Sequence, residues 1–167
     1  MDPSQLRFIL EELRFSAMLP AEVLDQLAAA STIKQIPAGT VIFREGGTND
    51  NLYLIRDGRL ALEMSVPGRG AVRILTLGAG EMVGWSALLD EGKMTASAIA
   101  VEDSEVVVAE AEKLRQLCRA NRDFGYHLME QMAAALSKRL VATRLQLLDL
   151  FAASPTPVPD RTSESEA

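Results

Sequence analysis

Soft metal ligands and disulfide partners are almost missing from the sequence, which holds one cysteine, Cys118, and one histidine, His127. A lone cysteine cannot form an internal disulfide, and these two residues cannot complete the four-ligand cage of structural zinc. We therefore assign no metal ligand. No motif for an activated nucleophile, a Walker loop or a carboxylate dyad occurs either. The sequence predicts a protein that is not an enzyme, has no catalytic residues and requires no cofactor.

Positive charge and long apolar runs are also scarce. Lys and Arg number 17 against 23 Asp and Glu, which gives a formal net charge of −6. Affinity for nucleic acid rests largely on basic side chains that displace counterions from phosphates, so we expect no direct binding to nucleic acid. No apolar run approaches the ~20 residues that span a bilayer, and Asp2 lies where a signal peptide would be basic. We expect a cytoplasmic protein without membrane contact.

The apolar residues that are present follow a helical period at the start of the chain. The 167 residues suffice for one domain with a sizeable core. Two short amphipathic helices are predicted at residues 4–14 and 20–30, the second of which begins at a proline. From residue 32 to residue 110 the period changes to two, and glycines separate the short runs. This change predicts a set of short strands.

Residues 59–77 give the clearest strand signal and read as a hairpin around the turn PGRG. In its first strand Leu60, Leu62, Met64 and Val66 alternate with residues that are small or polar. This alternation predicts one dry and one wet face. About eight short strands at this spacing indicate a sandwich, a jelly roll or a barrel.

The pattern returns to helix after residue 110, first at 110–120 and then at 122–152, where Asn121 or Asp123 could cap the start. Within the second helix, residues at steps of three and four form a seam along one side: Met129, Met132, Leu136, Leu140, Thr143, Leu147 and Leu150. A helix of ~30 residues is ~45 Å long, so its seam needs a partner, and a second copy is the simplest one. The alternative is that the whole helix folds back on its own barrel. The tail at 153–167 is predicted to be disordered, because it is rich in Pro, Ser and acidic residues.

Four sequence blocks follow one another in a characteristic order: PAGTVIFREGGTNDNLYLIRDGRLAL (37–62), LGAGEMVGWSALL (77–89), MTASAIAVEDSEVVVAE (94–110) and KRLVAT (138–143). From about Leu19 to Leu148 the chain resembles the cyclic-nucleotide-binding domain family, which includes the effector domains of catabolite-activator-type regulators. The resemblance implies a mainly β fold with flanking helices, a double-stranded β-helix or jelly-roll β-roll followed by a long C-terminal dimerisation helix. The corresponding boundaries are N-terminal helices at 1–31, the roll at 32–110, C-terminal helices at 111–152 and the tail at 153–167.

The resemblance also implies a ligand site. In this family the N–H groups of a short helical turn, here after Gly84, hold a cyclic phosphate. The family uses a Glu just after this glycine and an Arg before a Thr/Ser-Ala pair, and these positions here are Trp85 and Met94. Their loss would weaken binding of cAMP or cGMP by about two to four orders of magnitude. The residues assigned to ligand binding are Gly84, Trp85, Ser86, Ala87, Leu88, Lys93, Met94, Thr95, Ala96, Ser97, Arg139 and Thr143.

Three of these residues have competing interpretations. Lys93 either supplies a compensating charge or stays solvated. Arg139 and Thr143 lie four residues apart and share a helix face, where the resemblance places them near the base of a bound nucleotide. The alternative is that Arg139 is a surface charge and Thr143 a polar residue of the seam.

Trp85 decides between two functions. As a stacking platform it would leave room for a small ligand, a cyclic nucleotide with weak or altered specificity, and the chain would be a stand-alone sensor that signals through a homodimer at 122–152. As a plug beside Met94 it would make the chain a ligand-free dimeric scaffold for a protein partner. A third alternative is the effector part of a transcriptional regulator, although the fifteen residues after Ala152 are too few for a helix-turn-helix.

Overall fold

The computed structural model of the protein describes residues 1–89 and 92–153, so the predicted tail lies outside the described residues except for Ala153. Two helices, α1 (Pro3–Glu12) and α2 (Ala21–Ala29), come first, and α4 (Ala111–Ala120) and α5 (Arg122–Ala152) come last. The strands between them are β1 (Ser31–Ile36), β2 (Val41–Phe43), β3 (Asn51–Asp57), β4 (Leu60–Val66), β5 (Gly70–Leu77), β6 (Met82–Val83), β7 (Ser97–Ala100) and β8 (Ser104–Glu110). A short helix, α3 (Trp85–Leu89), interrupts them.

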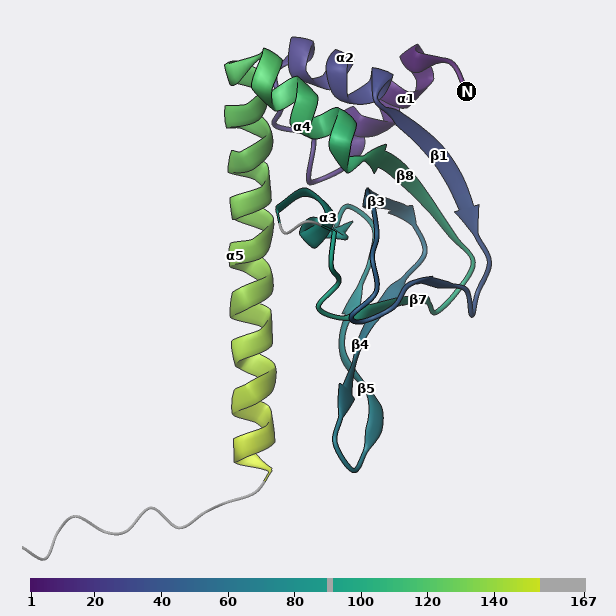
Figure 1. Ribbon diagram of the computed structural model, residues 1–167, viewed down its shortest axis with the longest axis vertical. Coiled ribbons are helices and arrows are strands. Elements are labelled where there is room, and N and C mark those ends of the chain that lie inside the picture. The colour runs from purple at the N-terminus through teal and green to yellow at the C-terminus, as the bar shows by residue number, and fades with distance from the viewer. Residues whose placement is uncertain (90–91, 154–167) are drawn as a thin grey trace, which may run out of the picture.

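The strands form two four-stranded sheets, in the orders β1-β8-β3-β6 and β2-β7-β4-β5. Every pair of neighbouring strands is antiparallel, and only β4 and β5 are joined by a hairpin. The other neighbours come from distant parts of the chain, so the sheets curl over each other as a jelly roll (Figure 1). The predicted fold class, mainly β with flanking helices, is confirmed.

The first sheet separates two hydrophobic cores, because side chains alternate between its faces. Leu52 and Leu54 of β3 pack against the helices, whereas Tyr53 and Ile55 of the same strand point into the roll. The helical core gathers α1, α2, α4 and the first half of α5 over this sheet. Both faces of β3 are therefore dry, which explains its unbroken apolar run.

The predicted alternation in β4 is wrong. Leu60, Ala61 and Leu62 are all buried, whereas Met64 is 37% exposed. The ladder with β5 shifts register after Leu62, and β7 pairs with β4 only as far as Glu63. Beyond that point β4 and β5 continue as a two-stranded ribbon, which extends away from the roll in Figure 1 and has no second sheet to cover it.

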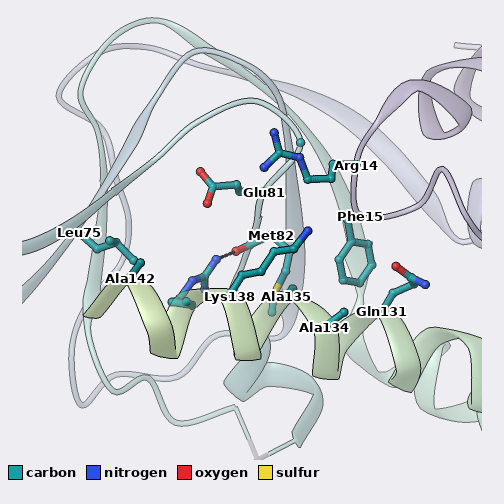
Figure 2. A pocket seen from close by; sticks show the side chains of 12 residues that line it. Arg14, Phe15, Leu75, Glu81, Met82, Gln131, Ala134, Ala135, Lys138 and Ala142 are labelled. Atoms are coloured by element: carbon teal, nitrogen blue, oxygen red, sulfur yellow. Dashed lines mark hydrogen bonds between the residues drawn. The ribbon is translucent and has the colours of Figure 1, made fainter. Parts of the chain in front are cut away.

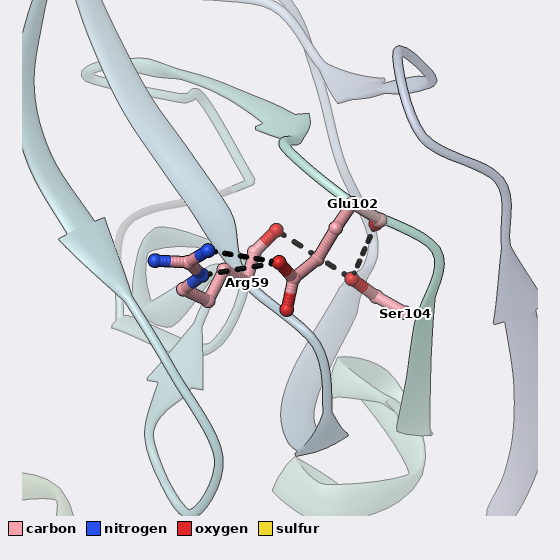
Figure 3. A network of polar contacts seen from close by, with 3 residues as sticks. All are labelled: Arg59, Glu102 and Ser104. Carbon is pink, nitrogen blue, oxygen red and sulfur yellow. Dashed lines mark hydrogen bonds and ion pairs between the residues drawn. The ribbon is translucent and has the colours of Figure 1, made fainter.

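A polar network fixes the turn between β3 and β4 against the turn that precedes β8 (Figure 3). The Arg59 guanidinium donates two hydrogen bonds to the Glu102 carboxylate, from Nε at 3.2 Å and from Nη2 at 3.0 Å. The buried Ser104 hydroxyl donates to the Glu102 carbonyl at 2.8 Å. Gly58 has a φ of +93°, and a Cβ at this residue would lie 2.7 Å from the Ser104 Cα. Glycine is therefore required at the turn.

Asn121, one of the two residues predicted to cap the start of α5, is the N-cap of this helix. Its side-chain oxygen accepts hydrogen bonds from the backbone N–H groups of Asp123 at 3.0 Å and Phe124 at 3.3 Å. Its amide group donates to the Gln26 side chain of α2 at 3.4 Å. The cap therefore joins the start of α5 to the N-terminal helices.

The two halves of α5 have different surroundings. Phe124, Leu128 and Met132 are buried in the helical core, whereas Leu140 and Leu147 are 52% and 53% exposed. The predicted seam is therefore wrong at Met132, because the first half of α5 turns this side of the helix toward its own domain. None of the helices among residues 1–89 and 92–153 has the length and hydropathy needed to cross a bilayer.

Candidate ligand-binding site

The candidate site begins where β6 meets α3, at Gly84. The backbone of Gly84 has a φ of +87°, and a Cβ there would lie 2.7 Å from the Asn51 carbonyl oxygen. Only glycine tolerates both conditions, so the turn into α3 depends on it. The carbonyl of Gly84 accepts a hydrogen bond from the N–H of Ala87 at 3.0 Å, which starts the short helix.

The segment that returns to the roll after α3 is fixed by the loop before β3. The backbone of Met94 exchanges hydrogen bonds with Gly46 and Gly47, at 2.8 and 2.9 Å, and the carbonyl of Gly92 accepts from the N–H of Asn49 at 2.8 Å. The buried Asn49 side chain accepts a hydrogen bond from the Tyr53 hydroxyl at 3.1 Å. Burial raises the pKa of Tyr53 above its ordinary value, which keeps this donor protonated.

The interior of the roll holds little free space at this site. The hollow has a volume of about 30 Å³, little more than the ~10–15 Å³ that one water molecule requires. Its lining consists of Phe43, Leu62, Val83, Gly84, Trp85, Ser86, Met94, Thr95, Ala96 and Arg139. Met94 is 3% exposed and belongs to the core inside the roll, so its side chain fills the space. Trp85 is partly buried and packs against the helical core while it borders the hollow.

Seven of the twelve residues assigned from the sequence line this hollow, and five lie elsewhere. Ala87 and Leu88 belong to α3 and are buried. Lys93 is exposed to solvent. The Ser97 hydroxyl accepts a hydrogen bond from the N–H of Glu45 at 2.8 Å, and the exposed Thr143 hydroxyl donates to the Arg139 carbonyl at 2.8 Å.

Three lining residues, Phe43, Leu62 and Val83, are missing from the sequence-based assignment. All three come from strands whose apolar side chains point into the roll. For Leu62, the sequence did contain a signal, because the alternating pattern placed this residue on an apolar face. Which inward positions approach the ligand segment depends on how the two sheets curl, and that information is not local.

Arg139 is the one basic side chain among the described residues that lines the hollow, and it reaches there from α5. Its Nη2 donates a hydrogen bond to the Met82 carbonyl, and its Nη1 is buried without a partner among the described residues. Burial lowers the pKa of Arg139 below its ordinary value, against a smaller opposing effect of Glu81. A buried guanidinium with unused donors favours an anionic acceptor.

The short helix α3 is also joined to the C-terminal helices. Arg115 of α4 donates from Nη1 to the Ala87 carbonyl at 2.7 Å and from Nε to the Glu112 carboxylate at 3.0 Å. The hydrogen bond from Arg115 lowers the pKa of Glu112. Since α4 leads directly into Asn121 and α5, a displacement of α3 has a direct route to the long helix.

Known proteins resemble this chain in sequence and in structure. The profile of the family described as cyclic nucleotide-binding domain matches residues 33–121. A cyclic AMP receptor protein of Thermus thermophilus is 34% identical over 80% of this chain and 59% of its own length. A CRP-like cAMP-activated global transcriptional regulator of Mycobacterium tuberculosis is 31% identical over 82% of this chain and 60% of its own length.

A solved structure agrees with these relatives. The crystal structure of the Thermus thermophilus catabolite activator protein superposes with a TM-score of 0.65 at 31% identity, covering 86% of this chain and 63% of that one. The chain thus spans about three fifths of the length of these relatives.

Proposed function

The chain belongs to the cyclic nucleotide-binding domain family, and from this membership we propose that it is a ligand-responsive regulatory domain and not an enzyme. The proposal rests on how the site is built. Gly84 and the start of α3 line the same hollow as Arg139 of α5, and Arg115 of α4 donates a hydrogen bond to the Ala87 carbonyl of α3. A ligand that moves α3 would therefore act on α5. The signal is the difference in ligand affinity between two arrangements of these helices.

The proposed ligand is a cyclic nucleotide that binds weakly or with altered specificity. The named relatives are a cyclic AMP receptor and a cAMP-activated regulator. The sequence resemblance assigns Trp85 and Met94 to the family's Glu and Arg positions. The hollow of about 30 Å³ is far below the ~300 Å³ at which small-molecule sites begin. Binding therefore requires displacement of the Trp85 indole at the border of the hollow, or of the Met94 side chain inside it.

Calorimetric titration with cAMP, cGMP and cyclic dinucleotides tests this proposal, together with the fluorescence of Trp85, the one tryptophan in the chain. We expect weak binding to the unmodified protein. The double variant Trp85→Glu/Met94→Arg restores the two charged groups of the family, and we expect it to bind cAMP about two to four orders of magnitude more tightly. Trp85→Gln is the matched control, because it removes the indole without adding the carboxylate.

Met94→Arg introduces a charge into the core, so circular dichroism and thermal unfolding must accompany each titration. If the double variant unfolds, Trp85→Glu alone keeps the test valid, because Trp85 is only partly buried; we expect about tenfold tighter binding than in Trp85→Gln. Absence of binding in the unmodified protein and in all folded variants would contradict a ligand site inside the roll.

The second candidate function is a ligand-free dimeric scaffold for a protein partner. The observation in its favour is that Met94, Phe43 and Leu62 leave almost no space inside the roll. In this case all cyclic nucleotides leave the Trp85 fluorescence unchanged, and the restoring substitutions create binding that the natural sequence has lost.

Both candidates use a homodimer through α5 within residues 122–152. A stripe with steps of three and four follows one side of the helix: Met129, Ala133, Leu136, Leu140, Thr143, Leu147 and Leu150. Met129 and Leu136 are partly buried against the helical core, so the part available for a partner is the exposed one from Leu140 to Leu150. Such spacing is typical of a two-stranded coiled coil. A second copy presents the same stripe, so a two-fold axis along α5 would bury both.

A further inference from the structure

A second hollow lies outside the roll, between three segments that are far apart in the sequence (Figure 2). One wall is α5, another is the turn between β5 and β6 at Gly80–Met82, and the third is the connection between α1 and α2 at Arg14 and Phe15. Its volume is about 270 Å³, which far exceeds the hollow of about 30 Å³ inside the roll. We call it the outer cavity.

Positive charge is concentrated around the outer cavity in a chain whose net charge is −6. Arg14, Lys138 and Arg139 line it, against the single carboxylate of Glu81. The Glu81 carboxylate accepts a hydrogen bond from the N–H of Gly78 at 2.7 Å. In the part of the chain that the structure describes, no ion pair within 4 Å joins Glu81 to any of the three basic side chains. The cavity therefore keeps an excess of positive charge.

Arg139 contributes more than its charge. Its guanidinium is oriented by the hydrogen bond to the Met82 carbonyl, and its Nη1 is buried without a partner among the described residues. A buried N–H without an acceptor costs free energy, and a carboxylate oxygen is the acceptor that guanidinium groups pair with best. Arg139 therefore supplies a preoriented donor for an anion.

Apart from Gln131, the rest of the lining is apolar or glycine. Phe15, Met82, Leu75 and the alanines of α5 form the wall, as Figure 2 shows around the basic side chains. The approach of the α1–α2 connection depends on Gly80, which has a φ of +86° and whose Cβ would lie 3.1 Å from the Arg14 Cβ. The cavity thus combines basic side chains with apolar surface, as ligand sites for amphipathic molecules do.

We propose that the outer cavity binds a small organic anion, a monocarboxylate with a short apolar chain, at a site distinct from the roll. The carboxylate pairs with Arg139, Lys138 and Arg14, and the apolar chain lies against Phe15 and Met82. Because the walls come from the N-terminal connection, the roll and α5, occupancy holds these three parts together. This inference does not depend on binding of a cyclic nucleotide inside the roll.

The outer cavity is also separate from the stripe proposed for dimerisation. Lys138 lies two residues from Leu140, which is about 200° around the helix axis at 100° per residue. A second copy paired through Leu140 and Leu147 would therefore leave the Lys138 side of α5 free. Arg139 lies nearer the stripe, about 40° from Thr143 around the helix axis, so the cavity borders such an interface at this residue.

Octanoate is the probe for a test by calorimetry and by ¹H–¹⁵N NMR chemical-shift mapping of the full chain, with 1-octanol, inorganic phosphate and cAMP as comparisons. We expect octanoate to bind and to shift the amides of residues 14–15, 80–82 and 131–142. Arg14→Gln and Lys138→Gln should each weaken binding about two- to fivefold, and both together about tenfold, because each removes one partly solvated ion pair. Lys34→Gln is the matched control, since it removes one charge from an exposed position on β1.

Three results would overturn the proposal. The first is no binding of octanoate up to about 10 mM. The second is equal binding in Lys34→Gln and in the Arg14→Gln/Lys138→Gln variant. The third is an affinity for octanol or for phosphate equal to that for octanoate, which would mean that the site does not recognise the carboxylate and the apolar chain in combination. Thr95→Val, at the roll hollow, should change cAMP binding and leave octanoate binding unchanged, so failure of the roll site and failure of this site remain distinguishable.

Discussion

Gly58 and Gly39 are two turn glycines with left-handed backbones, at φ +93° and +83°, that differ in their surroundings. A Cβ at Gly39 would meet nothing within 4 Å, whereas a Cβ at Gly58 would overlap the Ser104 side chain and Cα. Gly39→Ala should cost about 1 kcal/mol from backbone strain alone. Gly58→Ala should cost about 2 kcal/mol more in the free energy of unfolding, because the backbone at Ser104 must shift.

Urea unfolding of the two alanine variants measures this difference directly, since both carry the same strain at the glycine itself. Equal urea midpoints would show that the network of Arg59, Glu102 and Ser104 can shift to make room for a Cβ at Gly58 without lowering the free energy of unfolding. In that case the close approach of the two turns would not contribute to stability.

At the same scale, some site residues could be predicted from the sequence and others could not. The buried position of Met94 could be predicted, because an apolar side chain cannot replace the charged group that the family carries there, and it packs in the core instead. Phe43 and the unused donor of Arg139 could not. Both depend on how closely segments separated by tens of residues approach one another, which no local pattern records.

Among the elements, α5 depends on its cap at Asn121. Asn121→Ala removes the acceptor of the Asp123 and Phe124 N–H groups, and we expect a loss of about 1 kcal/mol in the free energy of unfolding. Asn121→Asp keeps the acceptor and loses only the long 3.4 Å contact to Gln26, so its stability should stay within about 0.5 kcal/mol of the unmodified protein. Thermal unfolding compares the two; an equal loss in both would mean that the contact to α2, and not the cap, is what matters.

The elements also show where periodicity is informative and where it fails. Glycine spacing and a period of two predicted short strands in a sandwich, a jelly roll or a barrel, because turn chemistry is local, whereas the β-roll was implied by the family resemblance. In β4 the dry and wet faces were predicted wrongly, because the ladder with β5 shifts register after Leu62 and β7, which begins at Ser97, covers β4 only as far as Glu63. In α5 the same apolar spacing includes Met132 of the core and Leu140 of the surface, because spacing does not say which partner covers a residue.

For the molecule as a whole, the exposed half of α5 is where assembly can be tested. Leu147→Glu places a charge on the stripe, next to its own copy across a two-fold axis, and should weaken the dimer by about thirtyfold or more. Leu145→Glu is the matched control, because Leu145 is similarly exposed but lies about 140° around the helix from Leu140.

Sedimentation velocity over a range of protein concentrations compares these two variants. A dimer in both, or in neither, would argue against the stripe as the interface. Thermal midpoints that rise with protein concentration in the unmodified chain and not in Leu147→Glu would add independent support.

Arg139 forms part of the wall of both hollows, the small one inside the roll and the larger one outside it. Both hollows share the charge of this one guanidinium, so an anion that pairs with Arg139 from one hollow lowers the positive potential that attracts an anion to the other. The two occupants would then oppose each other, and by thermodynamic reciprocity each would reduce the affinity of the other by the same factor. A domain of this design would report the ratio of two metabolites and not the abundance of either.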